Sequence, residues 1–311
     1  MLNNFSILTD SPIRFPGLFG DWAFTASGTI HLGSFTIHWY GILITLGLLL
    51  ASWYCLRHKE QYGIREDDFL DALIWGIPSG IIGARIYYVL FYLDLFRGSD
   101  GTFRWGSAIA VWDGGLAIYG AVIAIVIVAV VVCCIKKIKL FALLDFFAPG
   151  LLIGQAIGRW GNFMNREAFG GITGLPWRME LTTLTGDAVC VHPTFFYESL
   201  WNFIGFLLIA FIISKNRRFD GENTWFYCLW YGFGRFWIEG LRSDSLYLFH
   251  WQLFGQPIRV SQALSLVLVL VAAFMLYYHL SVKKHSPEEL FARKQASHTQ
   301  EQPEDPSREV E

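Results

Sequence analysis

The chain has 311 residues, of which 54% are hydrophobic, 17% aromatic and 16% charged. Soluble domains average about 25% charged residues, and several apolar stretches here reach the ~20 residues that span a bilayer, so the composition indicates a membrane protein. The formal net charge of −2 gives no indication of a nucleic-acid partner. The five cysteines lack metal-ligand spacing and four lie in or beside apolar runs, so we expect neither a metal site nor a structural disulfide.

The amino-terminal residues 1–34 carry several prolines and acidic residues. They lack the basic start and apolar core of a cleavable signal peptide. We expect this segment to be an extracytoplasmic lead-in that lies at the membrane interface, with Phe15, Phe19 and Trp22 as anchors.

The remaining apolar pattern predicts an all-α polytopic membrane protein with about seven transmembrane helices in 35–282. The expected spans are 35–56, 67–93, 107–135, 141–164, 193–214, 222–241 and 259–282. Residues 283–311 are rich in Glu, Gln, Ser and Pro and poor in apolar residues, which predicts a cytoplasmic, disordered tail.

Basic clusters set the expected orientation. They follow the first, third, fifth and seventh spans, at 57–59, 136–139, 215–218 and 283–284. These four ends lie on one side of the membrane, which the positive-inside rule makes cytoplasmic. We therefore expect the amino terminus outside and the carboxyl terminus inside.

With this orientation, polar side chains from six spans fall at one depth, just below the outer surface, while the inner halves of the spans carry almost none. They are Tyr40, Arg85, Tyr119, Arg159, Asn162, Asn165, His192, Glu198, Tyr231, Arg235, Glu239 and Arg242. Charged groups at membrane depth are costly, so they are rare and usually functional.

Each of these residues also has an ordinary structural explanation. A single arginine near a helix end is more often an anchor that reaches the interface. Tyr40 and Tyr231 fit an interfacial aromatic belt, and His192 before Pro193 fits a helix cap.

Three arginines on three spans are harder to explain singly. Arg85, Arg159 and Arg235 together favour an anion site, and at this depth the simplest anion is a phospholipid head group. Glu198 and Glu239 would be structural partners of the arginines. The spacing of 235, 239 and 242 places Glu239 on one helical face with Arg235 and Arg242.

One segment carries a family resemblance. The run Gly-Arg-Trp-Gly-Asn-Phe-Met-Asn-Arg-Glu at 158–167 resembles the signature Gly-Arg-x-Gly-Asn-Phe-x-Asn-x-Glu of bacterial prolipoprotein diacylglyceryl transferases. Shorter segments resemble that family in the same order along the chain. They are Trp-Tyr-Gly at 39–41, Gly-Ala-Arg-Ile at 83–86, Trp-Asp-Gly-Gly-Leu at 112–116, His-Pro-Thr at 192–194 with Tyr-Glu at 197–198, and Tyr-Gly-Phe-Gly-Arg-Phe at 231–236.

The resemblance implies a reaction in the bacterial cytoplasmic membrane, with the active site toward the extracytoplasmic leaflet. The family moves the sn-1,2-diacylglyceryl group of phosphatidylglycerol to the lipobox cysteine thiol of a prolipoprotein, and glycerol 1-phosphate leaves. Phosphatidylglycerol and the prolipoprotein signal peptide are then the partners, and no cofactor is needed.

The site residues fit this chemistry. Arg159 and Arg235 would stabilise the charge that develops on the departing phosphate. The other residues expected to bind phosphatidylglycerol are Asn162, Asn165, Glu167, Arg85, Tyr40 and Tyr231. Glu198, Glu239 and Arg242 would give structural support.

The base that ionises the thiol stays open at this stage. Many family members carry histidine where this chain has Tyr119, and tyrosine is a weak base at neutral pH unless arginines lower its pKa. His192 is an alternative base, and the arginine field could instead lower the pKa of the thiol itself. A phospholipid or organic-anion transporter using the same arginines is the alternative function, although the apolar inner halves of the spans argue against a continuous pathway.

Overall fold

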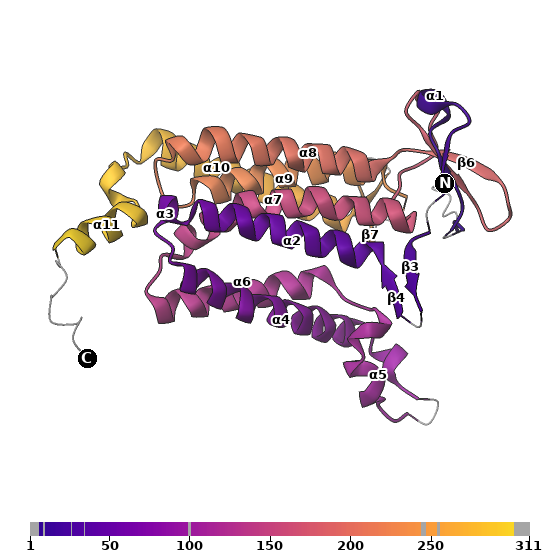
Figure 1. The fold of residues 1–311 in the computed structure, drawn as a ribbon, viewed down its shortest axis with the longest axis horizontal. Helices are drawn as coiled ribbons and strands as arrows, with labels where there is room; N and C mark the ends of the chain where they lie inside the picture. Colours follow the sequence, from indigo (N-terminus) through magenta and orange to yellow (C-terminus); the bar gives the residue numbers. More distant parts are fainter. Residues whose placement is uncertain are drawn as a thin grey trace. The chain divides into compact units, whose positions relative to one another are not determined.

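The computed structural model describes residues 6–8, 10–25, 27–33, 35–98, 101–243, 247–253 and 256–301. Long helices dominate the chain (Figure 1). The helices belong to two compact units. The first comprises Met1–Arg57 and Asp145–Pro287, and the second comprises His58–Leu144 and Glu288–Glu311.

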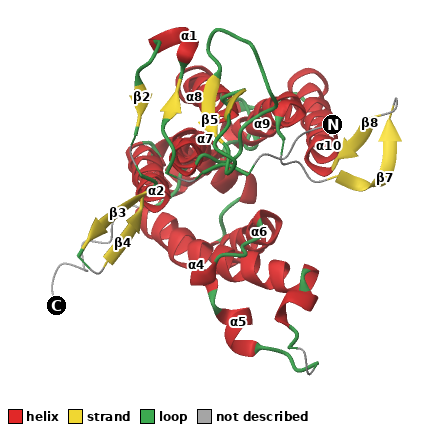
Figure 2. Ribbon diagram, turned by 90° about the vertical axis from the view of Figure 1, so that its right-hand side faces the viewer, coloured by secondary structure: helices red, strands yellow, loops and turns green. Residues whose placement is uncertain are grey.

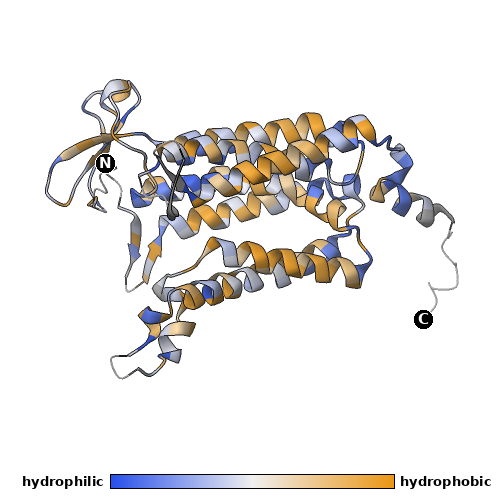
Figure 3. Ribbon diagram, turned by 180° about the vertical axis from the view of Figure 1, so that it is seen from behind, coloured by the Kyte–Doolittle hydropathy of each residue, from blue (hydrophilic) through white to orange (hydrophobic). Residues whose placement is uncertain are grey.

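Six helices in the described part are long and apolar enough to cross a membrane, which confirms a polytopic helical membrane protein (Figure 3). They are α2 (Trp39–Arg57), α4 (Glu66–Phe91), α6 (Ile118–Lys136), α7 (Leu140–Asn165), α8 (Thr194–Leu208) with its continuations η3 (Ile209–Ile213) and η4 (Ser214–Asn216), and α10 (Val260–Tyr277) with η5 (Tyr278–Val282). The seventh expected span is helix α9 (Glu222–Leu241), which is less apolar because it carries Arg235 and Glu239.

Two expected spans begin later than predicted. Residues 35–38 are not helical, because β4 (Phe35–His38) pairs with β3 (Thr29–Leu32) in an antiparallel hairpin. Residues 107–117 hold the short helices α5 (Trp105–Ile109) and η2 (Val111–Asp113) and a turn. Gly114 and Gly115 have φ angles of 83° and 70°, a left-handed conformation that ends helices.

The first unit also contains strands that the all-α prediction did not include. A four-stranded antiparallel sheet has the order β2-β1-β5-β6, formed by Ala23–Phe24, Ile13–Arg14, Met179–Thr182 and Ala188–Val191 (Figure 2). Part of the expected lead-in therefore belongs to a folded sheet. In the chain, α1 (Pro16–Phe19) follows β1 and precedes β2. A further hairpin pairs β7 (Tyr247–Leu253) with β8 (Gln256–Arg259).

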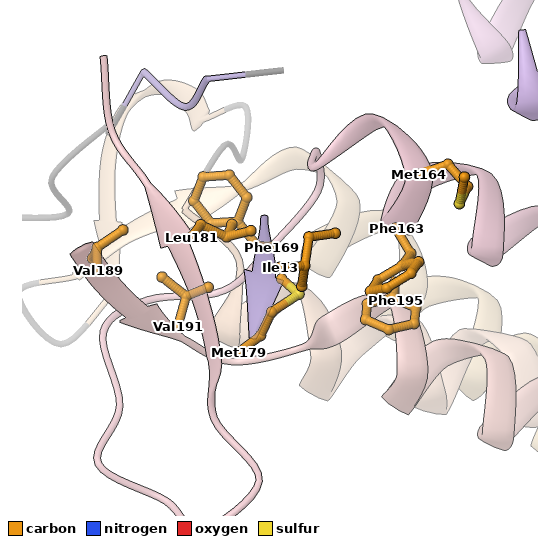
Figure 4. Close-up of a cluster of buried hydrophobic side chains, with 9 residues drawn as sticks. All are labelled: Ile13, Phe163, Met164, Phe169, Met179, Leu181, Val189, Val191 and Phe195. Atoms are coloured by element: carbon orange, nitrogen blue, oxygen red, sulfur yellow. The ribbon is translucent and has the colours of Figure 1, made fainter. Parts of the chain in front are cut away.

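A buried apolar cluster joins this sheet to the ends of two helices (Figure 4). Ile13, Leu181 and Val191 of the sheet are fully buried, and Phe163 of α7 and Phe195 of α8 pack in the same cluster with ring centroids 4.8 Å apart. The cluster therefore fixes the end of α7 that carries the Gly-Arg-Trp-Gly-Asn signature.

A reciprocal pair of tryptophans sets the register of α8 and α9. The indole Nε1 of Trp201 donates to the carbonyl oxygen of Trp230 at 2.9 Å, and the indole of Trp230 donates to the carbonyl of Trp201 at 2.8 Å. Their rings stack with centroids 4.3 Å apart. Gly205 and Gly234 make room for these rings, because a Cβ atom at either glycine would overlap an indole.

In the second unit, α4 and α6 pack closely through Gly83 and Gly120, where an added Cβ would meet the facing backbone. This unit also contains α3 (Lys59–Tyr62) and η1 (Leu93–Phe96). The prediction of a disordered tail is wrong for part of 283–311, because η6 (Pro287–Glu289) is followed by α11 (Phe291–Glu301), whose Ala292 packs on Gly63. Residues 302–311 lie outside the described part.

Candidate active site

The signature segment ends α7 in a Schellman motif. The backbone N–H of Glu167 donates to the carbonyl of Asn162 at 3.0 Å, and that of Arg166 donates to the carbonyl of Phe163 at 3.1 Å. Arg166 occupies the left-handed position with φ 52°, where glycine is usual. Its buried guanidinium donates to the carbonyl oxygen of Ser11 at 3.0 Å, which ties the helix end to the amino-terminal segment.

This turn brings the Glu167 carboxylate back over the last turn of the helix. Its Oε1 accepts hydrogen bonds from Nδ2 of Asn162 at 2.8 Å and Nδ2 of Asn165 at 3.3 Å. The Oδ1 of Asn162 in turn accepts from Nη1 of Arg159 at 3.2 Å. The four predicted residues of the signature therefore form one connected network.

The network continues across α8 and α9 as alternating charges. Oε1 of Glu198 lies 2.5 Å from Nη2 of Arg159 and 3.5 Å from Nη1 of Arg235. Nη2 of Arg235 lies 2.6 Å from Oε2 of Glu239. The structure thus brings together both predicted catalytic arginines and both predicted supporting glutamates.

Exposure differs between the acids and the bases of this network. The side chains of Glu198 and Glu239 are 4% and 2% exposed, whereas those of Arg159 and Arg235 are 22% and 18% exposed. A buried carboxylate needs a partner, and the arginines provide it. Because a guanidinium has five N–H donors, each arginine can still present donors to an external anion.

Sequence reasoning missed Arg259, which supports this network from the end of β8, directly before α10. Its buried guanidinium donates to the backbone carbonyls of Glu239 and of Arg242, the latter at 3.2 Å. A cation at these last carbonyls also complements the dipole of α9. The backbone N–H of Arg242 caps α9 by donating to the carbonyl of Glu239 at 3.2 Å. A basic residue directly before the apolar run 260–277 was the available signal.

Of the two predicted head-group tyrosines, Tyr40 packs against the neighbouring helix α7 and Tyr231 packs against a residue of its own helix α9. The ring of Tyr40 covers Gly161 of the signature, because a Cβ at Gly161 would lie 2.5 Å from Cδ2 of Tyr40. The side chain of Tyr40 is nevertheless exposed. The ring of Tyr231 stacks on Tyr227 with centroids 5.6 Å apart and an interplanar angle of 5°.

His192 lies directly after β6, outside the helices. Its Nδ1 is 3.3 Å from the hydroxyl of Tyr197, and that hydroxyl accepts a hydrogen bond from Nε1 of Trp177 at 2.7 Å. Partial burial lowers the pKa of His192 below its ordinary value of 6.5. The imidazole is therefore neutral at neutral pH and has a nitrogen that can accept a proton.

Arg85 and Tyr119 belong to the second unit. The guanidinium of Arg85 donates to four backbone carbonyls, those of Ser107, Ala108, Gly114 and Gly115, at 2.6, 2.9, 2.5 and 3.0 Å. It also lies over the rings of Tyr88 and Phe96. Arg85 thus holds the turn that precedes α6, and Tyr119 in the first turn of α6 has its ring 6.4 Å from that of Tyr87. Phosphate binding by Arg85 stays a prediction.

An open groove of about 640 Å³ follows β4 and one face of α2, from Thr36 to Leu49. Its lining is mostly apolar and includes neither arginine of the charged network, so we do not assign the chemistry to it. The described residues contain no group of three or more His, Cys, Asp or Glu side chains arranged to hold a metal ion.

Comparison with known proteins identifies the family. The family model of the prolipoprotein diacylglyceryl transferases matches residues 27–278. A phosphatidylglycerol–prolipoprotein diacylglyceryl transferase of Finegoldia magna is 43% identical over 239 residues, covering 77% of this chain and 90% of the relative. The proteins of that name from Lactobacillus delbrueckii subsp. bulgaricus and Listeria welshimeri are 42% and 41% identical, covering 81% and 80% of this chain and 90% and 88% of the relatives. The chain therefore belongs to the prolipoprotein diacylglyceryl transferase family.

Proposed function

We propose that this protein transfers the sn-1,2-diacylglyceryl group of phosphatidylglycerol to the lipobox cysteine thiol of a prolipoprotein, releasing glycerol 1-phosphate. Membership of the transferase family supports the reaction class. The assignment to residues rests on one observation: Arg159 and Arg235 both contact the same oxygen of Glu198, and both arginine side chains are partly exposed.

The network supports phosphate binding. Glu198 holds the two guanidinium groups in fixed positions, so little reorganisation is needed when an anion arrives. A phosphodiester placed at the exposed sides of Arg159 and Arg235 would receive charge-assisted hydrogen bonds from both. Asn162, which is held between Arg159 and Glu167, would contribute to the same surface.

The reaction is a substitution at the glycerol carbon that bears the phosphate of phosphatidylglycerol. The cysteine thiolate forms a sulfur–carbon bond, the carbon–oxygen bond to phosphate breaks, and the electron pair stays on the phosphate oxygen. Negative charge therefore moves from sulfur to the leaving glycerol phosphate. Arg159 and Arg235 stabilise that charge, the kind of electrostatic term that is often worth 10²–10³-fold in rate.

The thiol proton needs an acceptor. His192 is the better-supported candidate in the first unit, because its lowered pKa keeps the imidazole neutral at neutral pH. Tyr119 is the candidate in the second unit, at the position where many family members carry histidine. Direct ionisation of the thiol in the field of the arginines is the third route.

We place the reaction in the bacterial cytoplasmic membrane, at its extracytoplasmic leaflet. Basic residues that follow the first, third, fifth and seventh expected spans support a cytoplasmic position for those ends. Arg159 and Arg235 lie near the opposite ends of their helices, α7 and α9. Secreted prolipoproteins expose their lipobox on that side.

The test is a transfer assay with purified protein, phosphatidylglycerol vesicles and a labelled lipobox peptide. Arg159→Ala and Arg235→Ala should each lower the rate by at least about 10²-fold, measured as release of glycerol phosphate together with a gain in mass of the peptide. Arg14→Ala is the matched control, because Arg14 forms a half-exposed ion pair with Glu180 on the sheet.

Membrane insertion and thermal unfolding of each variant show that any loss is chemical. Parent-like transfer by both Arg159→Ala and Arg235→Ala would refute the assignment. Loss in the Arg14→Ala control at the same level would show that the assay reports general damage instead.

A further inference from the structure

A buried amide lies one helical turn below the charged network. Asn202 follows Glu198 by four residues on α8, so the two side chains lie on the same face. Asn202 is 1% exposed, and neither Oδ1 nor Nδ2 has a hydrogen-bond partner among the described residues. The proposed reaction gives this side chain no role.

A second unpartnered oxygen lies at the same level on α7. The ion pair between Arg159 and Glu198 and the hydrogen bond from Oγ of Ser199 to the carbonyl of Ala156, at 2.8 Å, fix the antiparallel register of α7 and α8. One turn down α7 from Arg159 is Gln155, opposite Asn202. Its Oε1 is buried and has no partner in the described part of the chain.

The third helix completes this layer with tyrosines. One turn down α9 from Arg235 is Tyr231, and the next turn brings Tyr227, whose hydroxyl accepts a hydrogen bond from Nε2 of Gln155 at 2.9 Å. The layer below the charged network is therefore polar on α7, α8 and α9, and its unused groups are two amide oxygens and one amide nitrogen.

The chemistry of these groups selects their ligand. A lipid ester or a phosphate oxygen offers acceptors, which leaves Oδ1 of Asn202 and Oε1 of Gln155 unmatched, and a cation leaves Nδ2 unmatched. Water both donates and accepts, and internal water commonly satisfies buried polar groups of this kind. We propose that Asn202 and Gln155 form an internal water site directly beneath the Arg159–Glu198–Arg235 network.

This site follows from burial and register alone and stands whether or not the proposed reaction is correct. The layer of side chains beneath the charged network is then polar and hydrogen-bonded instead of apolar. In the same layer, Gln155 holds the hydroxyl of Tyr227, and Tyr231 stacks on the ring of Tyr227.

The first experiment compares the thermal unfolding of Asn202→Leu and Asn202→Ala with that of the parent in detergent. Leucine fills the space of the water and leaves Oε1 of Gln155 unpaired, whereas alanine leaves room for water. We expect Asn202→Leu to lower the unfolding midpoint by at least about 4 °C and Asn202→Ala to lower it less. Leu152→Ala, in a fully buried apolar site of the same unit, is the control in which the smaller residue is expected to lose stability.

The opposite order overturns the proposal. In a dry layer, Asn202→Leu would equal or exceed the parent in stability, because it removes an unsatisfied buried amide, and Asn202→Ala would be the less stable variant.

The second experiment uses the parent protein and does not depend on the folding of a variant. X-ray radiolysis of the parent generates hydroxyl radicals from bound water, and mass spectrometry reads the oxidation of neighbouring side chains. Tyr227 should be oxidised above the level of Phe206, a buried ring in the apolar cluster of the same unit, after each rate is normalised to that of the unfolded protein. Equal normalised rates for Tyr227 and Phe206 contradict the water site.

Discussion

Arg159 and Arg235 of the first unit and Arg85 of the second unit are held by opposite kinds of partner. Arg159 and Arg235 of the first unit are held by carboxylates and keep about a fifth of their side chains exposed. Arg85 of the second unit is held by four backbone carbonyls and two aromatic rings, and it is 7% exposed. All three are arginines on long helices, so residue type alone does not distinguish them.

The difference lies in how many N–H donors of the arginine its partner leaves available to a ligand. A carboxylate neutralises the charge of Arg159 and fixes its position while using few of its donors. Backbone carbonyls accept hydrogen bonds from Nε, Nη1 and Nη2 of Arg85, so most of its donors are already paired. The first arrangement therefore suits binding and catalysis, whereas the second suits the positioning of a loop, here the turn at Gly114 and Gly115 that precedes Tyr119.

Replacing Arg85 should change the stability of the protein more than replacing Arg159, which would separate the two arrangements. Arg85→Met keeps the length of the side chain but removes every donor to the four carbonyls. Losing hydrogen bonds from a charged group at a buried site should lower the free energy of unfolding by about 3 kcal/mol or more. Thermal or denaturant unfolding in detergent measures this loss.

Arg159→Met is the matched variant for that measurement. Its side chain is partly exposed, and Arg235 remains beside the buried carboxylate of Glu198. The loss of stability should therefore be smaller, while transfer activity falls most. If Arg85→Met were as stable as the parent and had lost only activity, Arg85 would join Arg159 and Arg235 as a proposed catalytic residue, and the contrast between the two arrangements would fail.

A smaller effect tests whether the shared carboxylate positions the arginines. Glu198→Gln keeps the shape and one acceptor oxygen but removes the charge between Arg159 and Arg235. We expect about a tenfold lower kcat, since the guanidinium groups lose their fixed positions, while KM for phosphatidylglycerol is not raised, because the positive potential of the site increases. Steady-state transfer kinetics would separate the two parameters. A raised KM with unchanged kcat would instead place Glu198 in lipid binding.

Much of the helical architecture could be predicted from apolar run length. The helices α4, α7 and α9 begin and end within a few residues of the predicted spans. The strands could not be predicted in this way, because β1 and β2 are two residues long and are stabilised by pairing with distant residues, as Arg14 with Glu180. The helix at 291–301 was also missed, because its composition is polar and its contact with Gly63 is tertiary.

For the candidate site, the sequence identified a set of polar residues expected at one depth in the membrane. It did not indicate which of these residues contact one another. Spacing on one helix predicted the contact of Arg235 with Glu239, which the structure confirms. The contact of Arg159 with Glu198 depends on the register of α7 against α8, and the support from Arg259 depends on the packing of α10 on α9. Such contacts form between helices that are distant in the sequence. A single sequence gives no indication of them beyond the resemblance of its motifs to a family.

A still smaller effect concerns the candidate proton acceptors, His192 in the first unit and Tyr119 in the second. Partial burial lowers the pKa of His192 in the folded protein, so the unfolded chain binds a proton at that residue more readily. The contribution of His192 to stability is therefore constant above about pH 6.5 and falls as the pH drops through that value toward the folded pKa. His192→Gln removes this dependence, so its unfolding midpoint should fall less than that of the parent between pH 7.5 and pH 5.5. Parallel curves for the two proteins would show that His192 is not desolvated, which would remove the physical reason to prefer it over Tyr119 as the base.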